Sequence, residues 1–433
     1  MKICCFLFAL LVLEPCGSLT VGIVGAGPAG LTLAKTMCVD PSFQVTLFER
    51  STDPRKSRVG GGLQLTSGAY ALESHCGIDV RGIANEMRGV LSRDVDGETL
   101  LKLDIPQALK EADLPIDRGY AVMRSALQGL LYDSIANLGI VDIRLGTEVI
   151  DATTDGVLTL ADGSQEQFDV IVGCDGVGSI IEKKCFFDTE EEEEDSRKPS
   201  GVEVLFCVCD DSQREGQQYF DQWLGDGAYA LAATYGGERP GQLTDMIALC
   251  TASDEEEPPG KKKTSSWVDS QSELKDEARD VMRTAGLLKN SDLEPILDRA
   301  TRFYRASVVH RNPRFGAWHR GRAVLCGDAA HAMPPFLGQG ANQAIADACV
   351  LEKCLFQVGG YSTESLDDAL RTYYDIRFWP TTRLLLNSRF LGFLETQKGP
   401  GAKFRDNFFR TTGNLGIAKQ VFIDGATPRL GEP

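Results

Sequence analysis

The segment Cys326–Ala348, CGDAAHAMPPFLGQGANQAIADA, places an acid, a histidine, two prolines and two glycines before a predicted helix. Asp328 follows the strand-like run RAVLCG, and a carboxylate at the end of such a strand lies where open α/β sheets bind ligands. Gly338 and Gly340 would let a ligand approach the backbone. The N–H groups from Gly338 to Asn342 would then present the positive end of a helix dipole to an anionic group. The alternatives are a helix cap at Asp328 and an ordinary glycine-rich helix entry.

Three further residues of this segment are candidate catalytic groups. His331 could act as a general base, although a histidine that packs in the fold or lies beside a bound cofactor is the preferred interpretation. Pro334 and Pro335 force an extended backbone without N–H donors, so their carbonyls could face a ligand or substrate. The remaining histidines are scattered and no HExxH or paired-ligand spacing occurs, so no metal site is expected.

A second candidate site is GAGPAG, residues 25–30, between a strand-like run and helical spacing. Gly25 would make the tight turn, Gly27 would let a pyrophosphate approach the backbone, and Gly30 would let helix and strand pack closely. The phosphate would lie on the free N–H groups of the helix start. Glu49 ends the next predicted strand, 19 residues after Gly30, where a carboxylate can accept hydrogen bonds from ribose hydroxyls. This pattern predicts a dinucleotide site of the kind shared by NAD and FAD.

The hydrophobic periodicity predicts the elements that would position these groups. Strands are expected at TVGIVG (20–25), QVTLFER (44–50) and DVIVGCDG (169–176), and a helix at ALQGLLYDSIANLG (126–139). Further strands are expected at 201–209 and 227–237, which would belong to a second sheet. Helices dominate from residue 339 to residue 409. No long-period repeat occurs.

The composition excludes some classes of protein. The chain has 433 residues and a net charge of −17, and its one basic cluster, Lys261–Lys263, follows the acidic run DEEEPP. A nucleic-acid partner is therefore not expected. The acidic segments 188–200 and 253–266 are predicted surface loops, with a charged binding arm as the alternative. The sequence does not indicate an oligomeric state.

The N-terminal residues 1–18 are typical of a secretory signal peptide, with Lys2, an apolar run Ile3–Leu13 and then small residues. The run is too short for a stable membrane span, and a short membrane-associated extension is the alternative. The 13 cysteines form no CxxC pair or regular framework, which favours a reducing environment over a disulfide scaffold. Together these features predict the secretory pathway, or an organelle reached through it.

Three motifs, in order, resemble those of a known family, the group A FAD-dependent monooxygenases. These enzymes are similar to p-hydroxybenzoate hydroxylase and include zeaxanthin epoxidase-like and FAD-dependent urate hydroxylase-like members. The motifs are GAGPAG with FER (48–50), DVIVGCDGVGS (169–179) and GDAAHAMPPFLGQGANQAIADA (327–348). The segments RVGGGLQLTSGAYALE (58–73) and VMRSALQGLL (122–131) are also similar, and the resemblance covers roughly residues 19–395.

The resemblance implies an α/β fold. A Rossmann-like, glutathione reductase-like FAD-binding domain would comprise 19–75, 118–187 and 303–370. An inserted, mainly antiparallel β-sheet substrate domain would comprise 76–117 and 200–302. A C-terminal helical region would follow at 371–433.

The resemblance also implies cofactor contacts. Glu49 would bind the adenosine ribose, Arg124 the flavin or its phosphates, and Asp328 a ribitol hydroxyl. The full implied set is Gly25, Ala26, Gly27, Pro28, Ala29, Gly30, Glu49, Arg50, Gly62, Arg124, Asp328, Gly338, Gly340, Ala341 and Asn342. One position departs from the family, because Glu182 stands where DG-x-x-S-x-x-R has arginine. This departure puts efficient use of NAD(P)H in doubt, although Lys183 or Lys184 could substitute.

The implied activity is hydroxylation or epoxidation of a small apolar or aromatic molecule. It would use FAD, NAD(P)H and O2 through a flavin C4a-hydroperoxide, which must be kept from water. Phe220, Trp223 and Tyr229 are candidate pocket-lining residues, with ordinary core packing as the alternative. Two other functions remain open, namely an FAD-dependent reductase or dehydrogenase on the same scaffold and an FAD-binding protein without turnover.

Overall fold

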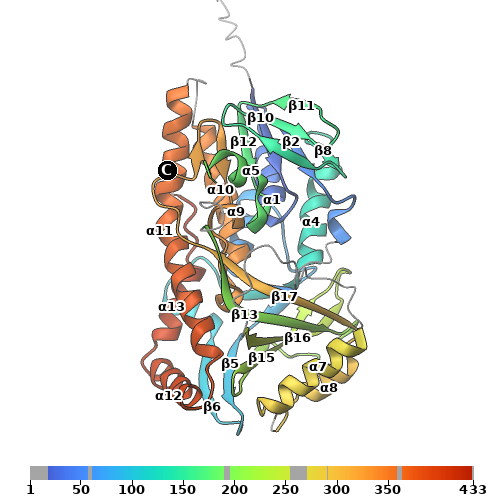
Figure 1. Ribbon diagram of the computed structural model, residues 1–433, viewed down its shortest axis with the longest axis vertical. Helices are drawn as coiled ribbons and strands as arrows, with labels where there is room; N and C mark the ends of the chain where they lie inside the picture. Colours follow the sequence, from blue (N-terminus) through green and yellow to red (C-terminus); the bar gives the residue numbers. More distant parts are fainter. Residues whose placement is uncertain are drawn as a thin grey trace, which may run out of the picture.

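The computed structural model describes residues 18–56, 61–189, 196–253, 271–289, 291–357 and 363–431. A six-stranded sheet forms one half of the molecule (Figure 1), in the order β18-β19-β12-β1-β2-β8. The strands from β19 to β8 run parallel, and β18 pairs antiparallel at the edge. The strands are β1 (Leu19–Val24), β2 (Phe43–Glu49), β8 (Asp142–Leu145), β12 (Val170–Gly173), β18 (His319–Arg320) and β19 (Ala323–Leu325).

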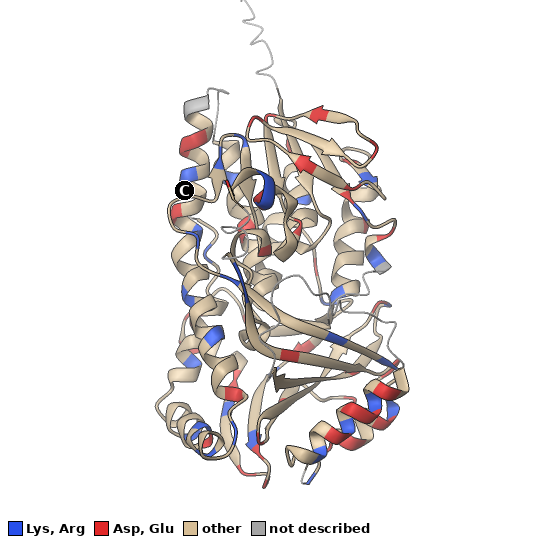
Figure 2. Ribbon diagram, viewed as in Figure 1, with Lys and Arg blue, Asp and Glu red and all other residues tan. Residues whose placement is uncertain are grey.

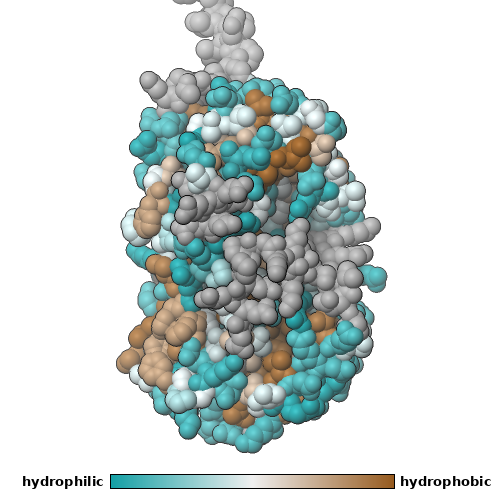
Figure 3. All heavy atoms as spheres, in the orientation of Figure 1, coloured by the Kyte–Doolittle hydropathy of each residue, from teal (hydrophilic) through white to brown (hydrophobic). Residues whose placement is uncertain are grey.

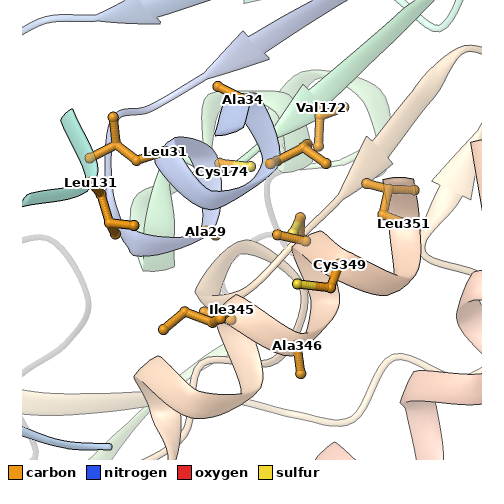
Figure 4. Close-up of a cluster of buried hydrophobic side chains, with 14 of the residues drawn as sticks. Ala29, Leu31, Ala34, Leu131, Val172, Cys174, Ile345, Ala346, Cys349 and Leu351 are labelled. Atoms are coloured by element: carbon orange, nitrogen blue, oxygen red, sulfur yellow. The ribbon is translucent and has the colours of Figure 1, made fainter. Parts of the chain in front are cut away.

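Helices cover this sheet, as expected for a parallel sheet that is buried on both faces. Two of these helices, α1 (Pro28–Met37) and α10 (Gly340–Phe356), pack against each other and belong to the two predicted sites. Figure 4 shows Ala29 and Leu31 of α1, Cys174 after β12, and Ile345 and Cys349 of α10 in one buried cluster. Because α1 and α10 pack together, the GAGPAG turn and the Asp328 segment are neighbours in space. The other helices here are α2 (Ser67–Cys76), α4 (Arg124–Ala136), α5 (Ile180–Cys185) and α9 (Asp328–His331).

A small antiparallel sheet follows β8 in the chain. It comprises β9 (Val149–Ala152), β10 (Val157–Leu160) and β11 (Gln165–Gln167). Turns with the sequence Asp-Gly connect its strands, and Gly156 and Gly163 both have positive φ. The chain then enters β12, so this sheet lies at the end of the molecule next to the first sheet (Figure 1).

The second half of the molecule is a ten-stranded sheet, mainly antiparallel, in the order β17-β13-β16-β15-β14-β5-β6, with β3, β4 and β7 attached beside β15. The parallel pairs within it are β14–β5 and β15–β7. Its strands are β3 (Gly62–Leu65), β4 (Asn85–Met87), β5 (Gly89–Asp94), β6 (Thr99–Asp104), β7 (Gly119–Met123), β13 (Arg197–Val208), β14 (Tyr219–Leu224), β15 (Ala228–Gly236), β16 (Leu243–Ala252) and β17 (Arg302–Arg311). The α/β fold with an inserted antiparallel sheet is confirmed.

Different helices cover the two faces of this large sheet. The charged helix α7 (Gln271–Thr284) and α8 (Leu293–Arg299) bury Leu274, Met282 and Ile296 against one face (Figure 2). The opposite face packs against the C-terminal helices, where Leu394 and Phe409 meet sheet residues. These helices are α11 (Thr363–Glu395), α12 (Pro400–Asn414) and α13 (Ile417–Ala426), and α3 (Ile105–Glu111) follows β6.

The strand pairings differ from the expected boundaries in several places. β17 pairs with β13 along its length, so the chain leaves the large sheet after Arg311 rather than at 303. β3 and β7 also hydrogen-bond to the large sheet, although 62–65 and 119–123 were assigned to the FAD-binding domain. The predicted loop 188–200 ends earlier than expected, because β13 already begins at Arg197. Residues 190–195 and 254–266 lie outside the described residues, as do 1–17 of the predicted signal peptide.

Candidate functional site

The three glycines of the GAGPAG turn have three different surroundings. A Cβ on Gly25, whose φ is +105°, would lie 2.6 Å from the Cys174 carbonyl oxygen, and one on Gly30 would lie 2.0 Å from the Gly25 carbonyl oxygen. A Cβ on Gly27 would meet nothing within 4 Å. Gly25 and Gly30 therefore allow close packing of strand and helix, whereas Gly27 leaves open space at the start of α1. Pro28 occupies the first turn of α1, and the N-cap residue Gly27 has no side chain to cap this helix start.

Glu49 lies at the end of β2, beside the turn. Its Oε2 accepts a hydrogen bond from the Ala26 N–H at 2.8 Å, and its Oε1 accepts one from the Ser51 N–H at 2.8 Å. Each carboxylate oxygen keeps acceptor capacity for a further donor, such as a ribose hydroxyl. Arg50 follows and is exposed.

Arg124 begins α4 on the other side of this region. Its backbone N–H donates to the Gly61 carbonyl at 3.2 Å, and its Nε is buried without a hydrogen-bond partner among the described residues. An unpartnered buried guanidinium N–H is costly unless a ligand accepts from it. Gly62 lies nearby at the start of β3, where a Cβ would fall 2.0 Å from the Tyr235 ring. The glycine is thus required for close contact with the large sheet.

Asp328 starts the short helix α9, and its side chain is exposed. The N-cap position belongs to Gly327, so the alternative of a helix cap at Asp328 is wrong. Asp328 Oδ1 is 3.9 Å from where a Cβ on Gly340 would lie, at the start of α10. The side chain of the N-cap residue Gln339 makes no capping hydrogen bond to α10, and Gly340 and Ala341 are half-buried. The Asp328 carboxylate and the uncapped start of α10 therefore lie close together. Such a pair can bind the hydroxyl groups and the anionic group of one ligand.

Asn342 joins two segments that are far apart in the sequence. Its Oδ1 accepts hydrogen bonds from the Thr66 and Gly68 N–H groups, both at 2.9 Å, and so caps the start of α2. Its Nδ2 donates to the Gln64 carbonyl at 2.9 Å. A Cβ on Gly338, whose φ is +63°, would also meet Gln64 at 2.6 Å. The Asn342 side chain therefore connects α10 to β3 and α2, and the residue is fully buried.

His331 is part of a buried ionic network. Its Nε2 lies 2.5 Å from Asp347 Oδ2, and Asp347 Oδ1 accepts from Arg377 Nε at 2.6 Å. Asp347 also accepts the Gly327 N–H, which fixes the turn before Asp328. His331 and Arg377 hold the pKa of the Asp347 carboxyl below its usual range, although burial opposes this effect. A catalytic role for His331 is not supported, because both its pairing and its contact with Trp318 point into the core.

The Pro-Pro step does not leave both carbonyls free. The Pro334 carbonyl accepts a hydrogen bond from Ser388 Oγ of α11 at 2.6 Å, so it faces the C-terminal helices rather than a ligand. Pro335 begins a short 3-10 turn with Phe336 and Leu337. The Phe336 ring lies 6.4 Å from that of Tyr229, on β15 of the large sheet. The prolines therefore carry Phe336 to the junction between the two halves of the molecule.

The candidate lining residues lie on both faces of the large sheet. Tyr229 is in the cluster that includes Phe336, and Phe220 packs on Tyr235 at 5.4 Å between ring centroids. Trp223 lies on the opposite face, in the core under α7 and α8, and Arg93 lies over its ring. Trp223 is therefore a core residue. It is next in the strand to Leu224, which pairs with Tyr229, and neighbouring positions of a strand point to opposite faces.

Arg311 is a residue of this site that sequence reasoning missed. Its guanidinium pairs with Glu182 in the protein interior and donates to the Val177 carbonyl at 2.6 Å and the Asp328 carbonyl at 3.0 Å. Arg314 approaches Glu182 at 2.9 Å. Arg311 of β17 thus connects the motif at 169–179 with the motif at 327–348. The family's arginine at position 182 is replaced by Glu182, which pairs with this guanidinium. Glu182, Arg311 and Arg314 line an open pocket of about 650 Å³ together with Phe186, Phe187 and Ser196. The absence of the family's arginine at position 182 was the one feature of the sequence that indicated a different arrangement of charges here.

Comparison with known proteins agrees with this geometry. The model of the family described as "FAD binding domain" matches residues 18–384. The chain belongs to the group A FAD-dependent monooxygenases. Aurachin C monooxygenase/isomerase of Stigmatella aurantiaca is 30% identical over 350 residues, which is 78% of this chain and 80% of the relative. 3-Hydroxybenzoate 6-hydroxylase 1 of Aquipseudomonas alcaligenes is 27% identical over 402 residues, which is 89% of this chain and 91% of the relative. This monooxygenase is thus an FAD-dependent oxidoreductase.

Solved structures support the fold of this monooxygenase. Klebsiella pneumoniae HpxO complexed with FAD and uric acid matches with a TM-score of 0.72 and 18% identity, covering 95% of this chain and 98% of that one. A salicylate hydroxylase substrate complex matches with a TM-score of 0.71 and 20% identity, covering 96% and 99%. The residues present fit FAD, because the Gly27 opening, the Glu49 carboxylate, the unpartnered Arg124 Nε and the Asp328 carboxylate are the groups that its pyrophosphate and hydroxyls require.

Proposed function

We propose that this monooxygenase hydroxylates or epoxidises a small apolar or aromatic molecule with NAD(P)H and O2. The observation that carries the proposal is the contact between Phe336, next to the Pro-Pro step, and Tyr229 of the large sheet. Through this contact, the segment that starts at Asp328 meets an aromatic surface of the inserted sheet. An apolar, aromatic wall favours a flat apolar substrate. The relative named 3-hydroxybenzoate 6-hydroxylase 1 also supports an aromatic substrate. So does 6-hydroxynicotinate 3-monooxygenase of Pseudomonas fluorescens, which is 26% identical over 359 residues.

The residues of this chain would bind, orient and exclude water. Arg124 and the helix starts would hold the negative charge of the cofactor, and Asp328 would fix its ribitol. The apolar junction around Tyr229 and Phe336 would keep water from the reacting atoms. When bound, FAD would supply the redox chemistry that couples NAD(P)H oxidation to the activation of O2.

The Glu182–Arg311 pair bears on the alternative of an FAD-binding protein without turnover. That alternative rests on the loss of arginine at 182, yet Arg311 and Arg314 bring two guanidinium groups to the same place. This arrangement supports retention of a functional site. The reductase alternative predicts flavin reduction without oxygen transfer.

One experiment tests the proposal against both alternatives. The purified FAD-loaded protein is mixed with NADH or NADPH, and nucleotide oxidation and O2 uptake are followed with phenols, purines and carotenoids. We expect a substrate to stimulate oxidation and to appear as an oxygenated product. Absence of flavin reduction with every combination would contradict the proposal, and reduction without an oxygenated product would favour the reductase.

We further propose that residues 1–18 direct the chain into the secretory route. The first described strand begins at Leu19, so removal of these residues would leave the fold intact. N-terminal sequencing of the protein from its native cells tests this proposal, with a new terminus near residue 19 as the expected result. An intact Met1 on protein recovered from the cytosol would contradict it.

A further inference from the structure

The outer face of α11 carries a stripe of exposed apolar residues that no other part of the described chain covers. Trp379, Leu386, Phe390 and Phe393 are each at least half exposed, with values from 50% to 66%. Their spacing places them on one side of the helix. Isolated exposed apolar side chains are ordinary on soluble proteins, but a contiguous group indicates a binding surface.

The stripe continues onto α12. Phe404 is 64% exposed, and Phe408 lies between it and Phe390, with ring centroids 6.3 Å and 5.7 Å away. Figure 3 shows apolar side chains gathered over this part of the molecule, at the lower left. We call this surface, made by Trp379, Leu386, Phe390, Phe393 and Phe404, the aromatic face.

The aromatic face is basic in a chain that is strongly acidic. Residues 376–394 contain no Asp or Glu, whereas the whole chain has a net charge of −17; the exposed Asp375 lies one turn before Trp379, at the end of the face. Arg383 and Arg389 are exposed between the apolar residues, and Lys403 is exposed beside Phe404. Asp424 lies 3.9 Å from Arg383. Figure 2 shows the bands of Lys and Arg along α11. A partner for this surface must therefore combine apolar character with negative charge.

Two kinds of partner have to be distinguished. A second copy that used the same face would bring Arg383, Arg389 and Lys403 against their own equivalents, because a two-fold interface pairs a patch with itself. An anionic lipid surface suits the face better, since Trp and Phe enter the headgroup region while Lys and Arg contact acidic lipids. Among the described residues, no helix combines the length and apolar character needed to cross a bilayer, so binding would be peripheral.

We propose that the aromatic face docks this monooxygenase on the surface of a membrane that contains anionic lipids. The inner side of the same helix contacts the proposed substrate region, where Ser388 holds the Pro334 carbonyl and Gly392 lies under the Phe336 ring. In the docked protein, α11 would therefore lie between the membrane surface and the proposed substrate region. Membrane docking follows from the exposed residues of the aromatic face and does not depend on the proposed oxygenation.

The test is flotation of the full FAD-loaded chain with phosphatidylcholine vesicles, with or without phosphatidylserine. We expect flotation only with phosphatidylserine, and its loss in high salt. The double variants Leu386→Ser/Phe393→Ser and Arg389→Glu/Lys403→Glu should each reduce partition by at least about tenfold. The matched controls are Val39→Ser, which is 72% exposed in the other half, and Arg283→Glu on α7, which should float like the original chain.

Folding is monitored by circular dichroism and by the absorbance of bound FAD, so that an unfolded variant is recognised. If neither variant changes flotation, another part of the chain, such as residues 1–17, is responsible and the proposal is wrong. Failure of the original chain to float on phosphatidylserine vesicles would also overturn it. Sedimentation that reveals a dimer lost in both variants would assign the face to a second copy instead.

Discussion

The carboxylate of Glu182 pairs with the guanidinium of Arg311 in the protein interior, where the two side chains are only 4% and 2% exposed. Burial lowers the pKa of Arg311, and the nearby Glu182 carboxylate opposes this effect. Because Arg311 also binds the Val177 and Asp328 carbonyls, the pair connects the second and third motifs of the FAD site. Its loss should therefore affect both stability and cofactor binding.

Replacement Glu182→Gln should lower the free energy of unfolding by about 3–5 kcal/mol, because it leaves a buried guanidinium without a counter-charge. FAD affinity should fall as well. Denaturant unfolding and FAD fluorescence titration measure the two effects. The control is Asp280→Asn, which removes an exposed ion pair with Arg283 and should change stability by less than about 0.5 kcal/mol. Equal effects of the two substitutions would contradict a special role for Glu182.

Substitutions in the GAGPAG turn should separate folding from cofactor binding. Gly27→Ala adds a methyl group in open space, so the apoprotein should keep its stability while FAD binding weakens by about tenfold or more. Gly30→Ala would force a methyl group against the Gly25 carbonyl and should destabilise the apoprotein by about 1–3 kcal/mol or more. Thermal unfolding of both apoproteins and FAD titration distinguish these results. A Gly27→Ala protein with unchanged FAD affinity would place the pyrophosphate elsewhere.

Substitution of Asp328 should mainly affect FAD binding, whereas substitution of Asp347 should mainly affect the stability of the apoprotein. Asp328→Asn removes an exposed carboxylate, so FAD binding should weaken by roughly 10–100-fold with little change in apoprotein stability. Asp347→Asn disrupts the buried contacts with His331 and Arg377 and should cost about 3–5 kcal/mol of stability. Calorimetric titration with FAD and denaturant unfolding measure the two quantities. A large loss of apoprotein stability in Asp328→Asn would argue for a structural role.

The raised pKa of the buried Glu395 carboxyl should make the stability of the protein depend on pH. Burial raises its pKa to about 7, despite the hydrogen bond donated by Gln222 Nε2 to its Oε1 at 2.7 Å. Between the usual carboxyl pKa and about 7 the folded state binds more protons than the unfolded state, so stability should fall as pH rises through this interval. The fall attributable to Glu395 is at most about 3 kcal/mol.

Glu395→Gln should remove this part of the slope and make the protein more stable at pH 8 than the original chain. Denaturant unfolding between pH 5 and pH 8 (roughly the window set by the two pKa values) measures the change. A residual slope is expected from Glu352, whose pKa burial also raises to about 7. An unchanged slope in Glu395→Gln would mean that Glu395 is already ionised in the folded protein.

The amino-acid sequence by itself determined the parts of the site that depend on local spacing. Gly25, Gly27 and Gly30 specify a turn and a helix start within a few residues, and Asp328 follows its strand directly. Such features depend on backbone conformation and on unpaired N–H groups near the end of one element, so a short pattern is sufficient. For the same reason, periodicity predicted individual strands of both sheets, whereas the α/β fold with an inserted antiparallel sheet was implied by the resemblance to the family.

Only the tertiary structure decided which side chains are partners. His331 faces Asp347 instead of a ligand, the Pro334 carbonyl is bound by Ser388, and Glu182 meets Arg311 from the last strand of the large sheet. Each pair joins segments that no local pattern relates. Trp223 and Tyr229 likewise lie on opposite faces of the sheet because the register of β14 and β15 sets the direction of each side chain. Burial then imposes the pairing, since a charged or polar group removed from water must find its partner within the fold.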